Sequence, residues 1–343
     1  MNILSIDTSC DETSAAVTNE RKIISNVVFS QIPIHAKWGG VVPSLAKRAH
    51  EERIGEVIKK ALQKTPIETI GAIAVTQGPG LAMALEVGML AAKELASKNG
   101  IPLLAINHLE GHLYSVFAQN RNGNPPTAIQ FPYLSMIISG GHTEFVLWKD
   151  HLSYELLGAT LDDAAGEALD KAGKLLGLGY PAGAVIERLA EEVNNSDEYS
   201  FPRPMLKSNN LQFSFSGLKT AFYYFLKKMP EEEKQKKIRQ LASSFQRAVF
   251  DTILFKAEKA MMQTGVNNLV IGGGVAANKY LRKRFHLLVK KYKGSVLFPT
   301  TKKLTGDNAA MIGIAAWQYA KKKRWAKKDV ERIPRFPLNS SCN

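Results

Sequence analysis

Short apolar runs that end in small polar turns alternate along the chain with longer segments of helical periodicity. An apolar run at residues 3–7 meets a turn rich in hydroxyls and carboxylates at residues 8–14 and then a second β-prone run at 15–17, which predicts a β-hairpin. The same pattern returns at residues 133–148, where two apolar runs flank Ser139-Gly140-Gly141-His142-Thr143. The chain therefore contains two blocks that open in the same way.

Alternating strands and helices follow each of the two openings. We expect further strands at residues 70–76, 101–106 and 269–271, and helices at residues 44–64, 164–176 and 237–264. Three more helices are expected: one that ends near residue 98, one that holds residues 108–112 and one that starts near residue 278. Strands alternating with helices are typical of α/β proteins. We predict a duplicated α/β architecture with a ligand bound between the halves.

Positive charge is concentrated towards the C-terminal end of a basic chain. The 343 residues include 45 Lys and Arg against 31 Asp and Glu, a formal net charge of +14. Residues 279–306 hold nine Lys or Arg and no acid, and residues 321–328 hold six more. Such runs are often simply solvated surface, but in this number they indicate an anionic partner such as nucleic acid.

Cysteine content and hydropathy point to a cytoplasmic protein. There are two cysteines, Cys10 and Cys342, too few for a disulfide framework. The first residues carry no basic segment typical of a signal peptide, and glycine and proline interrupt the most apolar stretch at residues 71–85. We therefore expect no association with a membrane.

The segment His108-Leu109-Glu110-Gly111-His112 contains a spacing typical of metal ligands. Histidines at positions i and i+4 lie on one face of a helix and can share one ion, although two unrelated histidines would produce the same spacing. A metalloprotease of the His-Glu-x-x-His type has Glu directly after the first His, where this chain has Leu109. Asp307 is the best candidate for a third ligand, and a His₂Asp set suits iron or zinc.

Three turns resemble sites at which a backbone approaches a ligand. Ser139-Gly140-Gly141 and Gly272-Gly273-Gly274 each follow a predicted strand, and successive backbone N–H groups in such turns can bind an anion. The third turn, at residues 8–14, offers Ser9 and Asp11 for contact with a phosphate or nucleotide. None of the three fits a P-loop or a dinucleotide-binding fingerprint. Each glycine turn alone is more often a tight bend, but together they favour a nucleotide site.

An acidic segment at residues 162–171 stands out in this basic chain. Asp163, Glu167 and Asp170 fall on neighbouring positions of the predicted helix. A solvated face supported by i,i+4 pairs explains them without any ligand. A site for ribose or amine groups is the alternative.

Taken in order, these segments resemble the TsaD family, whose members have long carried the name O-sialoglycoprotein endopeptidase. The matching segments run through nearly the whole chain, at residues 7–14, 39–43, 77–81, 107–112, 139–143, 162–171, 201–204, 213–220, 273–278 and 307–308. The resemblance is to the bacterial or mitochondrial branch.

The resemblance implies an actin/Hsp70-like (ASKHA) fold and a threonylcarbamoyltransferase activity. Residues 1–130 plus about 305–343 would form one subdomain and residues 131–304 the other. The enzyme would be an acyltransferase that moves L-threonylcarbamoyl from threonylcarbamoyl-AMP to N6 of the adenosine 3′-adjacent to the anticodon, in tRNAs that read codons beginning with A. Bacterial relatives use a paralogous TsaB-like subunit and a TsaE-like ATPase, whereas the mitochondrial type is a homodimer.

The resemblance also implies roles for particular residues. His108, His112 and Asp307 would bind one divalent metal ion, Fe²⁺ with Zn²⁺ as the alternative. The residues that would hold the threonylcarbamoyl-adenylate are Ile137, Ile138, Ser139, Gly140, Gly141, Asp170, Gly183, Glu187 and Asn278. No general base is assigned.

Other classes of function share some of these features. A carbamoyltransferase acting on a small metabolite would have the same cleft and metal but no need of the high positive charge, and an ATPase or sugar kinase would lack the two-histidine site. A tRNA-binding scaffold without enzymatic activity would lack the metal.

Overall fold

The structure, a computed structural model, describes residues 1–338 and separates them into two compact units. Unit 1 contains residues 1–131, 150–154 and 299 onwards, and unit 2 contains residues 132–149 and 155–298. Cys342 lies outside the described residues.

Unit 1 is built on a five-stranded sheet. Its strands are β1 (Asn2–Asp7), β2 (Glu12–Asn19), β3 (Lys22–Ser30), β4 (Ile70–Gly78) and β5 (Leu103–Asn107). They lie in the order β3-β2-β1-β4-β5, in which β1, β2 and β3 pair antiparallel and β1, β4 and β5 pair parallel. Its helices are α1 (Ile32–His35), α2 (Pro43–Ala61), α3 (Ala82–Asn99), α4 (His108–Tyr114) and α11 (Ala309–Lys321), with 3₁₀ turns at Ala36–Trp38, Ile67–Thr69, Ser115–Phe117 and Lys302–Leu304.

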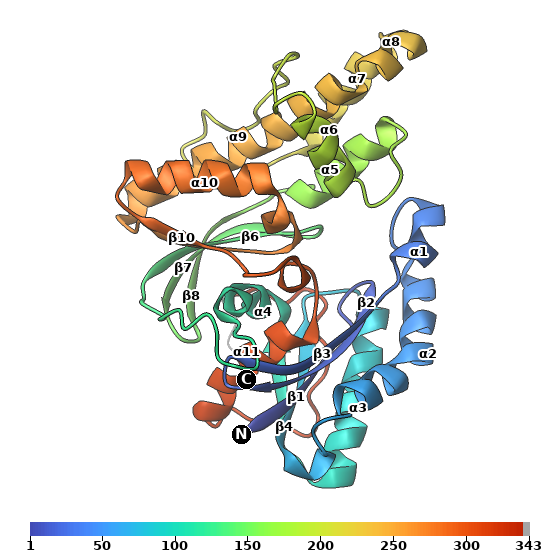
Figure 1. Ribbon diagram of the computed structural model, residues 1–343, viewed down its shortest axis with the longest axis vertical. Coiled ribbons are helices and arrows are strands. Elements are labelled where there is room, and N and C mark those ends of the chain that lie inside the picture. The colour runs from blue at the N-terminus through green and yellow to red at the C-terminus, as the bar shows by residue number, and fades with distance from the viewer. Residues whose placement is uncertain (339–343) are drawn as a thin grey trace. The chain divides into compact units, whose positions relative to one another are not determined.

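Both faces of this sheet are covered, because successive side chains of β1 point to opposite sides. Leu4 and Ile6 pack in one apolar cluster with residues of α2 and α3, two helices that lie beside this sheet in Figure 1. Between them, Ser5 faces α11 and its Oγ donates to the carbonyl oxygen of Ala309 over 2.6 Å. Gly313 lets α11 approach closely, since a Cβ there would lie 2.5 Å from Thr18 Oγ1. The last described helix therefore completes the first unit.

Unit 2 repeats the topology of unit 1. Its strands are β6 (Tyr133–Ile138), β7 (Thr143–Asp150), β8 (Ser153–Ala159), β9 (Asn268–Gly272) and β10 (Ser295–Leu297). Their order, β10-β9-β6-β7-β8, is again third-second-first-fourth-fifth when read from β8. The β6–β7 pair is antiparallel, and the β6–β9 and β9–β10 pairs are parallel. The prediction of a duplicated α/β fold is confirmed.

Helices cover one face of the second sheet (Figure 1). The helices of this unit are α5 (Ala165–Leu175), α6 (Gly183–Glu191), α7 (Ser216–Lys227), α8 (Glu231–Lys236), α9 (Ile238–Thr264) and α10 (Lys279–Lys291), with a 3₁₀ turn at Gly274–Ala277; α8 has no buried residue. Met136 and Phe145 of the sheet share one buried cluster with Phe245 of α9 and Phe285 of α10. Apolar residues recur along α9 because it passes through the middle of this core.

No helix within residues 1–338 combines the length and the apolar composition that a membrane span requires.

Candidate metal centre and glycine turns

The two histidines of the predicted metal motif lie on one helix, and the residue that precedes this helix, Asn107, fixes where it starts. Strand β5 ends at Asn107, and the Asn107 side chain accepts a hydrogen bond from the backbone N–H of Leu109 over 2.9 Å. This N-cap starts α4 at His108. His108 and His112 are therefore one turn apart, and both are buried.

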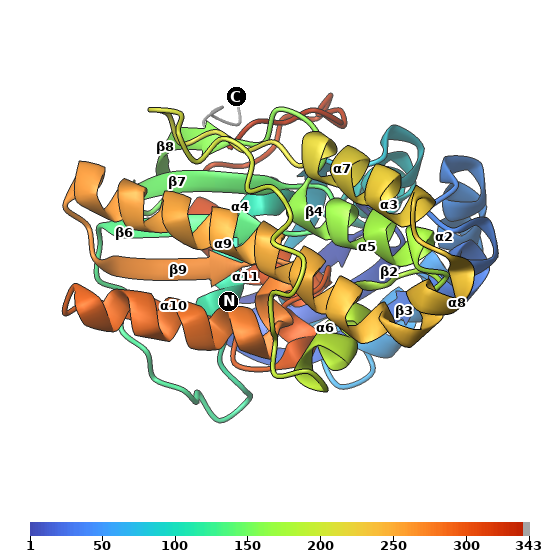
Figure 2. The same ribbon diagram turned by 90° about the horizontal axis from the view of Figure 1, so that it is seen from above.

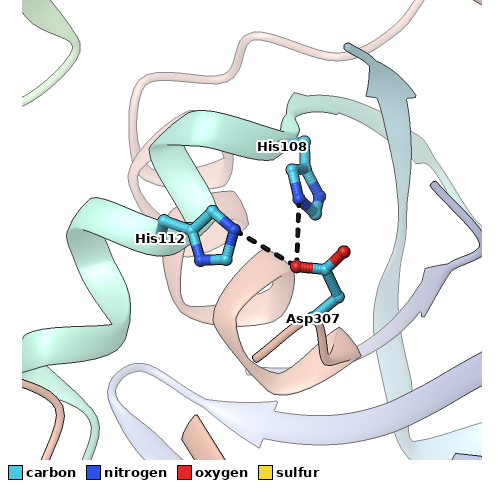
Figure 3. A group of neighbouring side chains, drawn as sticks. All are labelled: His108, His112 and Asp307. Carbon is cyan, nitrogen blue, oxygen red and sulfur yellow. Dashed lines mark ion pairs between the residues drawn. The ribbon is translucent and has the colours of Figure 1, made fainter. Parts of the chain in front are cut away.

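Asp307 comes from a distant part of the sequence and lies against both histidines (Figure 3). One of its carboxylate oxygens, Oδ1, is 3.4 Å from His108 Nε2 and 3.2 Å from His112 Nε2. Asn308, the next residue, caps α11 by accepting from the N–H of Met311 over 3.2 Å. The start of α11 thus fixes Asp307 in place, as the start of α4 fixes the histidines.

The geometry of this group fits a metal ion. The three potential ligand atoms all lie within 4.8 Å of one another. Donors about 2.1 Å from one ion would be roughly 3–3.5 Å apart, close to the two distances from Asp307. In addition, both ring nitrogens of His112 are buried and neither makes a hydrogen bond within residues 1–338, although Nε2 lies 3.2 Å from Asp307 Oδ1. A metal would satisfy one of them.

Negative charge dominates the electrostatics around the group. Burial lowers the pKa of His108, but the carboxylates of Asp307 and Asp7 outweigh it and raise that pKa to about 10. Burial together with the charges of Asp307, Asp11 and Asp7 raises the pKa of Glu12 well above its usual range. A divalent cation would relieve this repulsion.

Asp7 ends the first predicted strand and begins the matching segment at residues 7–14, but no role at the metal centre was predicted for it. Its Oδ2 lies 3.8 Å from His108 Nδ1, on the side of the ring away from Asp307, and is buried without a hydrogen-bond partner in the described chain. A carboxylate behind a ligating imidazole typically orients the ring and raises its basicity. A carboxylate ending a buried strand beside a hydroxyl-rich turn is the only sequence signal that could have indicated this role.

Ser9 and Asp11 lie in the β1–β2 turn of the same unit. The carbonyl oxygen of Ser9 accepts from Leu81 N–H over 2.8 Å, and that of Asp11 accepts from Gln31 N–H over 2.8 Å. His50 of α2 supports this turn, with Nε2 3.0 Å from the carbonyl oxygen of Cys10 and Nδ1 2.7 Å from Thr13 Oγ1. Ser9 Oγ is buried without a hydrogen-bond partner in residues 1–338.

The first glycine turn of unit 2 is held tightly. It continues from Ile137 and Ile138 at the end of β6, and Ser139 Oγ accepts from the N–H groups of Gly141 and His142 over 3.3 and 3.0 Å. Among residues 1–338, no heavy atom lies within 4 Å of where a Cβ on Gly140 or Gly141 would be, so this side of the turn is open.

Two other glycines, Gly166 and Gly273, lie in close contact with the backbone of this turn. A Cβ on Gly166 of α5 would lie 2.5 Å from the carbonyl oxygen of Ser139, and one on Gly273 would lie 2.4 Å from that of Ile138. Gly273 also has φ +95, a conformation that favours glycine. The two predicted glycine turns are therefore packed against each other in unit 2.

The remaining predicted substrate residues connect four helices of unit 2. Asp170 Oδ1 accepts from the N–H groups of Ala182 and Gly183, over 2.8 and 3.2 Å, at the start of α6. Glu187 Oε1 accepts from Lys279 N–H over 2.7 Å at the start of α10. Asn278 caps α10 through Leu281 N–H at 2.9 Å, and its Nδ2 donates to Gln246 of α9 over 2.9 Å. These residues lie where the ends of several helices meet.

The prediction of an acidic helical face is wrong for one residue, Asp163. Asp163 precedes α5, because the chain there forms a turn in which Thr160 Oγ1 donates to the Asp163 carbonyl oxygen over 2.8 Å. Its side chain pairs with Lys171 at 2.7 Å and Lys219 at 3.4 Å, and Glu167 also pairs with Lys171. Most of this acidic charge is thus neutralised within the unit.

Two units of the same five-stranded topology define the class of protein. Solved structures that share the ASKHA-like fold include full-length HypF in a phosphate- and nucleotide-bound form, with a TM-score of 0.57 at 15% identity over 94% of this chain and 55% of that one. A ROK family glucokinase from Streptomyces griseus has a TM-score of 0.50 at 11% identity, over 92% of this chain and 99% of that one. At these identities the likeness concerns the fold alone.

Sequence comparison identifies the family within this class. A profile of the TsaD family, described as tRNA N6-adenosine threonylcarbamoyltransferase, matches residues 22–314. Curated proteins of that name include those of Endomicrobium trichonymphae (46% identical, 99% of both chains) and Geotalea uraniireducens (43% identical, 99% of this chain and 97% of that one). The chain belongs to the TsaD family and is a transferase that modifies tRNA, which confirms the resemblance seen in the sequence.

Proposed function

We propose that the protein transfers L-threonylcarbamoyl from threonylcarbamoyl-AMP to N6 of the adenosine 3′-adjacent to the anticodon, in tRNAs that read codons beginning with A. The observation that supports this most strongly is the family match over residues 22–314 combined with an intact His108–His112–Asp307 group. Compact units 1 and 2 would be the two actin-like subdomains.

In the proposed reaction, the adenine amine attacks the carbamoyl carbon. The bond between that carbon and the phosphate oxygen breaks, AMP leaves with the electron pair, and one N6 proton is released. The amine is a weak nucleophile, because its lone pair is shared with the ring, so positioning and polarisation of the carbonyl group matter most. No nucleophilic side chain is required.

His108, His112 and Asp307 would hold one divalent ion, Fe²⁺ or alternatively Zn²⁺, which would supply a Lewis acid for the threonylcarbamoyl carbonyl. Asp7 would hold the His108 ring in its ligating orientation. The open side of residues 137–141 would let the backbone approach the adenylate closely. Asp170, Gly183, Glu187 and Asn278 would form the rest of that pocket, with Ser9 and Asp11 contributing a phosphate or nucleotide contact from unit 1.

The proposal extends to partners and location. tRNA and threonylcarbamoyl-AMP are the substrates, and a TsaB-like subunit and a TsaE-like ATPase would assist in a bacterial setting, with a homodimer as the mitochondrial-type alternative. The enzyme would work in the cytoplasm, where its tRNA substrates are found.

Mass spectrometry of bulk tRNA from cells depleted of the protein tests the function. Loss of the threonylcarbamoyl mark supports the proposal, whereas its retention would favour a small-molecule carbamoyltransferase or a kinase. Reconstituted transfer with and without the candidate partners then shows whether the chain acts alone.

The metal centre is tested by His112→Ala. We expect this variant to lose metal binding by calorimetry and transfer activity together. His151→Ala serves as the control, because His151 lies in the same unit, 2.9 Å from the Tyr114 hydroxyl, but outside the group. Full transfer activity in His112→Ala would remove the metal from the mechanism.

A further inference from the structure

The positive charges of α10 fall into two groups with different surroundings. The helix carries six Lys or Arg and no acid. Three are engaged within unit 2: Arg284 pairs with Asp251 at 3.3 Å, Lys291 with Glu258 at 2.6 Å, and Arg282 Nε donates to the Ala276 carbonyl oxygen over 2.6 Å. These three are explained by packing within the unit.

The other three are lysines that make no side-chain hydrogen bond or ion pair with any described residue. Lys279, Lys283 and Lys290 are all exposed. At 100° per residue they fall within about 40° of one another around the helix, along a stripe roughly 16 Å long. Lys279 and Lys283 are also an i,i+4 pair of like charge, which is unfavourable in an isolated helix. The stripe thus has the charge that a polyanion would balance.

The apolar side of α10 is already in use. Leu281, Phe285 and Val289 are buried in the core of unit 2, and α9 runs beside α10 in both views (Figures 1 and 2). A helix that binds a membrane surface needs a free apolar face to insert. With that face occupied, the lysines favour a hydrated polyanion.

The stripe begins beside the candidate adenylate residues. Asn278 caps α10 and Glu187 accepts from the backbone N–H of Lys279. An RNA that reaches a threonylcarbamoyl-adenylate held by these residues would therefore come close to Lys279, and its phosphates could follow the helix towards Lys290. Phosphate contacts of this kind position a nucleic acid without reading its sequence.

We propose that Lys279, Lys283 and Lys290 form the surface of unit 2 along which the phosphate backbone of the substrate tRNA lies. The proposal rests on the proposed function and adds to it the face and the side chains that hold the RNA. Arg284, Lys291 and Arg282 are excluded from this role by their contacts within the unit.

The test replaces the three lysines with glutamine and measures binding of an unmodified tRNA transcript against salt concentration. The logarithm of the binding constant falls linearly with the logarithm of the salt concentration. Each lost phosphate contact should make this slope shallower by roughly 0.7–0.9, so the slope of the triple variant should be shallower by about 2. We expect affinity to fall roughly 10- to 100-fold near 0.1 M salt. In steady-state transfer the KM for tRNA should rise while kcat at saturating tRNA stays close to that of the wild type.

The matched control is the triple variant Lys59→Gln, Lys64→Gln and Lys98→Gln. These lysines of unit 1 are also exposed and make no side-chain hydrogen bond or ion pair with residues 1–338, and the change in net charge is the same. Thermal unfolding of both variants checks that they fold. An equal loss of tRNA binding in the control would overturn the proposal, since net charge alone would then explain the effect.

Three further results separate the possible failures. An unchanged salt slope in the α10 variant, while the wild-type enzyme transfers threonylcarbamoyl, would overturn the stripe and leave the proposed function intact. If the wild type binds tRNA through the stripe but transfers no threonylcarbamoyl, the proposed function is wrong while the proposed tRNA-binding surface is supported. Loss of binding to phosphatidylserine vesicles with unchanged tRNA binding would assign the stripe to membranes and overturn the proposal.

Discussion

Replacing Gly166 with alanine should impair transfer far more than it impairs folding. The new Cβ would lie 2.5 Å from the Ser139 carbonyl oxygen and 2.9 Å from the Ser139 carbonyl carbon. To reach an ordinary contact of 3.4 Å, the glycine turn must move by up to about 0.9 Å relative to α5. The obstacle is backbone, which cannot rotate out of the way as a flexible side chain would.

The expected magnitudes follow from this displacement. Overpacking costs about 1–3 kcal/mol, and alanine recovers up to about 1 kcal/mol of helix propensity, so the net destabilisation should be roughly 0–2 kcal/mol. A shift of almost 1 Å in a group that positions a substrate can reduce the rate of reaction about 100-fold. We therefore expect kcat/KM to fall roughly 10- to 100-fold in a protein that remains folded.

Gly217→Ala is a matched control for this experiment. Gly217 is the second residue of α7, as Gly166 is of α5, but a Cβ there would have no heavy atom within 4 Å. It should gain up to about 1 kcal/mol in stability and keep full activity. Steady-state transfer assays and chemical denaturation measure both effects. Wild-type kcat/KM in Gly166→Ala would refute the view that the turn positions the substrate.

Three further predictions concern charge and packing. Burial raises the pKa of Glu144 to about 7, so between about pH 4.5 and 7 the folded state holds a proton that the unfolded state releases, and stability falls as pH rises. The free energy of unfolding of Glu144→Gln should accordingly equal that of the wild type at pH 4 and exceed it by about 1–2 kcal/mol at pH 8, allowing for the partial exposure of this side chain. Urea denaturation at both pH values tests this, and equal stabilities at pH 8 would contradict it. Gly313→Ala should cost about 1–3 kcal/mol by forcing α11 away from Thr18, seen as a lower Tm, and an unchanged Tm would show that the helix can yield. Asp7→Asn should weaken metal binding about 10- to 100-fold by calorimetry, and wild-type affinity would exclude Asp7 as an orienting partner of His108.

Local pattern was sufficient to predict several of the elements that carry the candidate site, but not α6, which holds Gly183 and Glu187. The two strand–turn–strand openings and the helix with His108 and His112 depend on apolar alternation and i,i+4 spacing, which are properties of nearby residues. The edge strands β3 and β8 were not predicted, because their half-exposed sequences alternate only weakly. Helix α11 was also missed, since an element buried on nearly every side has no polar face to mark its period.

Contacts between distant residues set the limit of the sequence analysis. The pairing of Asp7 with His108 depends on β1 and α4 meeting in space, and nothing in the spacing of those residues indicates it. The prediction that Asp163 lies on a helix was wrong, because a hydrogen bond from Thr160 holds Asp163 in a turn just before α5 begins. Periodicity places residues around an axis but does not show where tertiary contacts end the helix.

The late position of Asp307 has a consequence for how the protein is made. About 195 residues separate this carboxylate from His112, and α11, which completes the layer over β1 and β2, follows directly after it. At ~5–20 residues per second, a ribosome needs roughly 10–40 s to travel from one to the other. During that interval the nascent chain has two histidines but lacks the candidate third ligand, and one face of the sheet is uncovered. The unit that begins first is thus finished last, and premature termination before residue 307 leaves a product that lacks one ligand of the proposed metal centre.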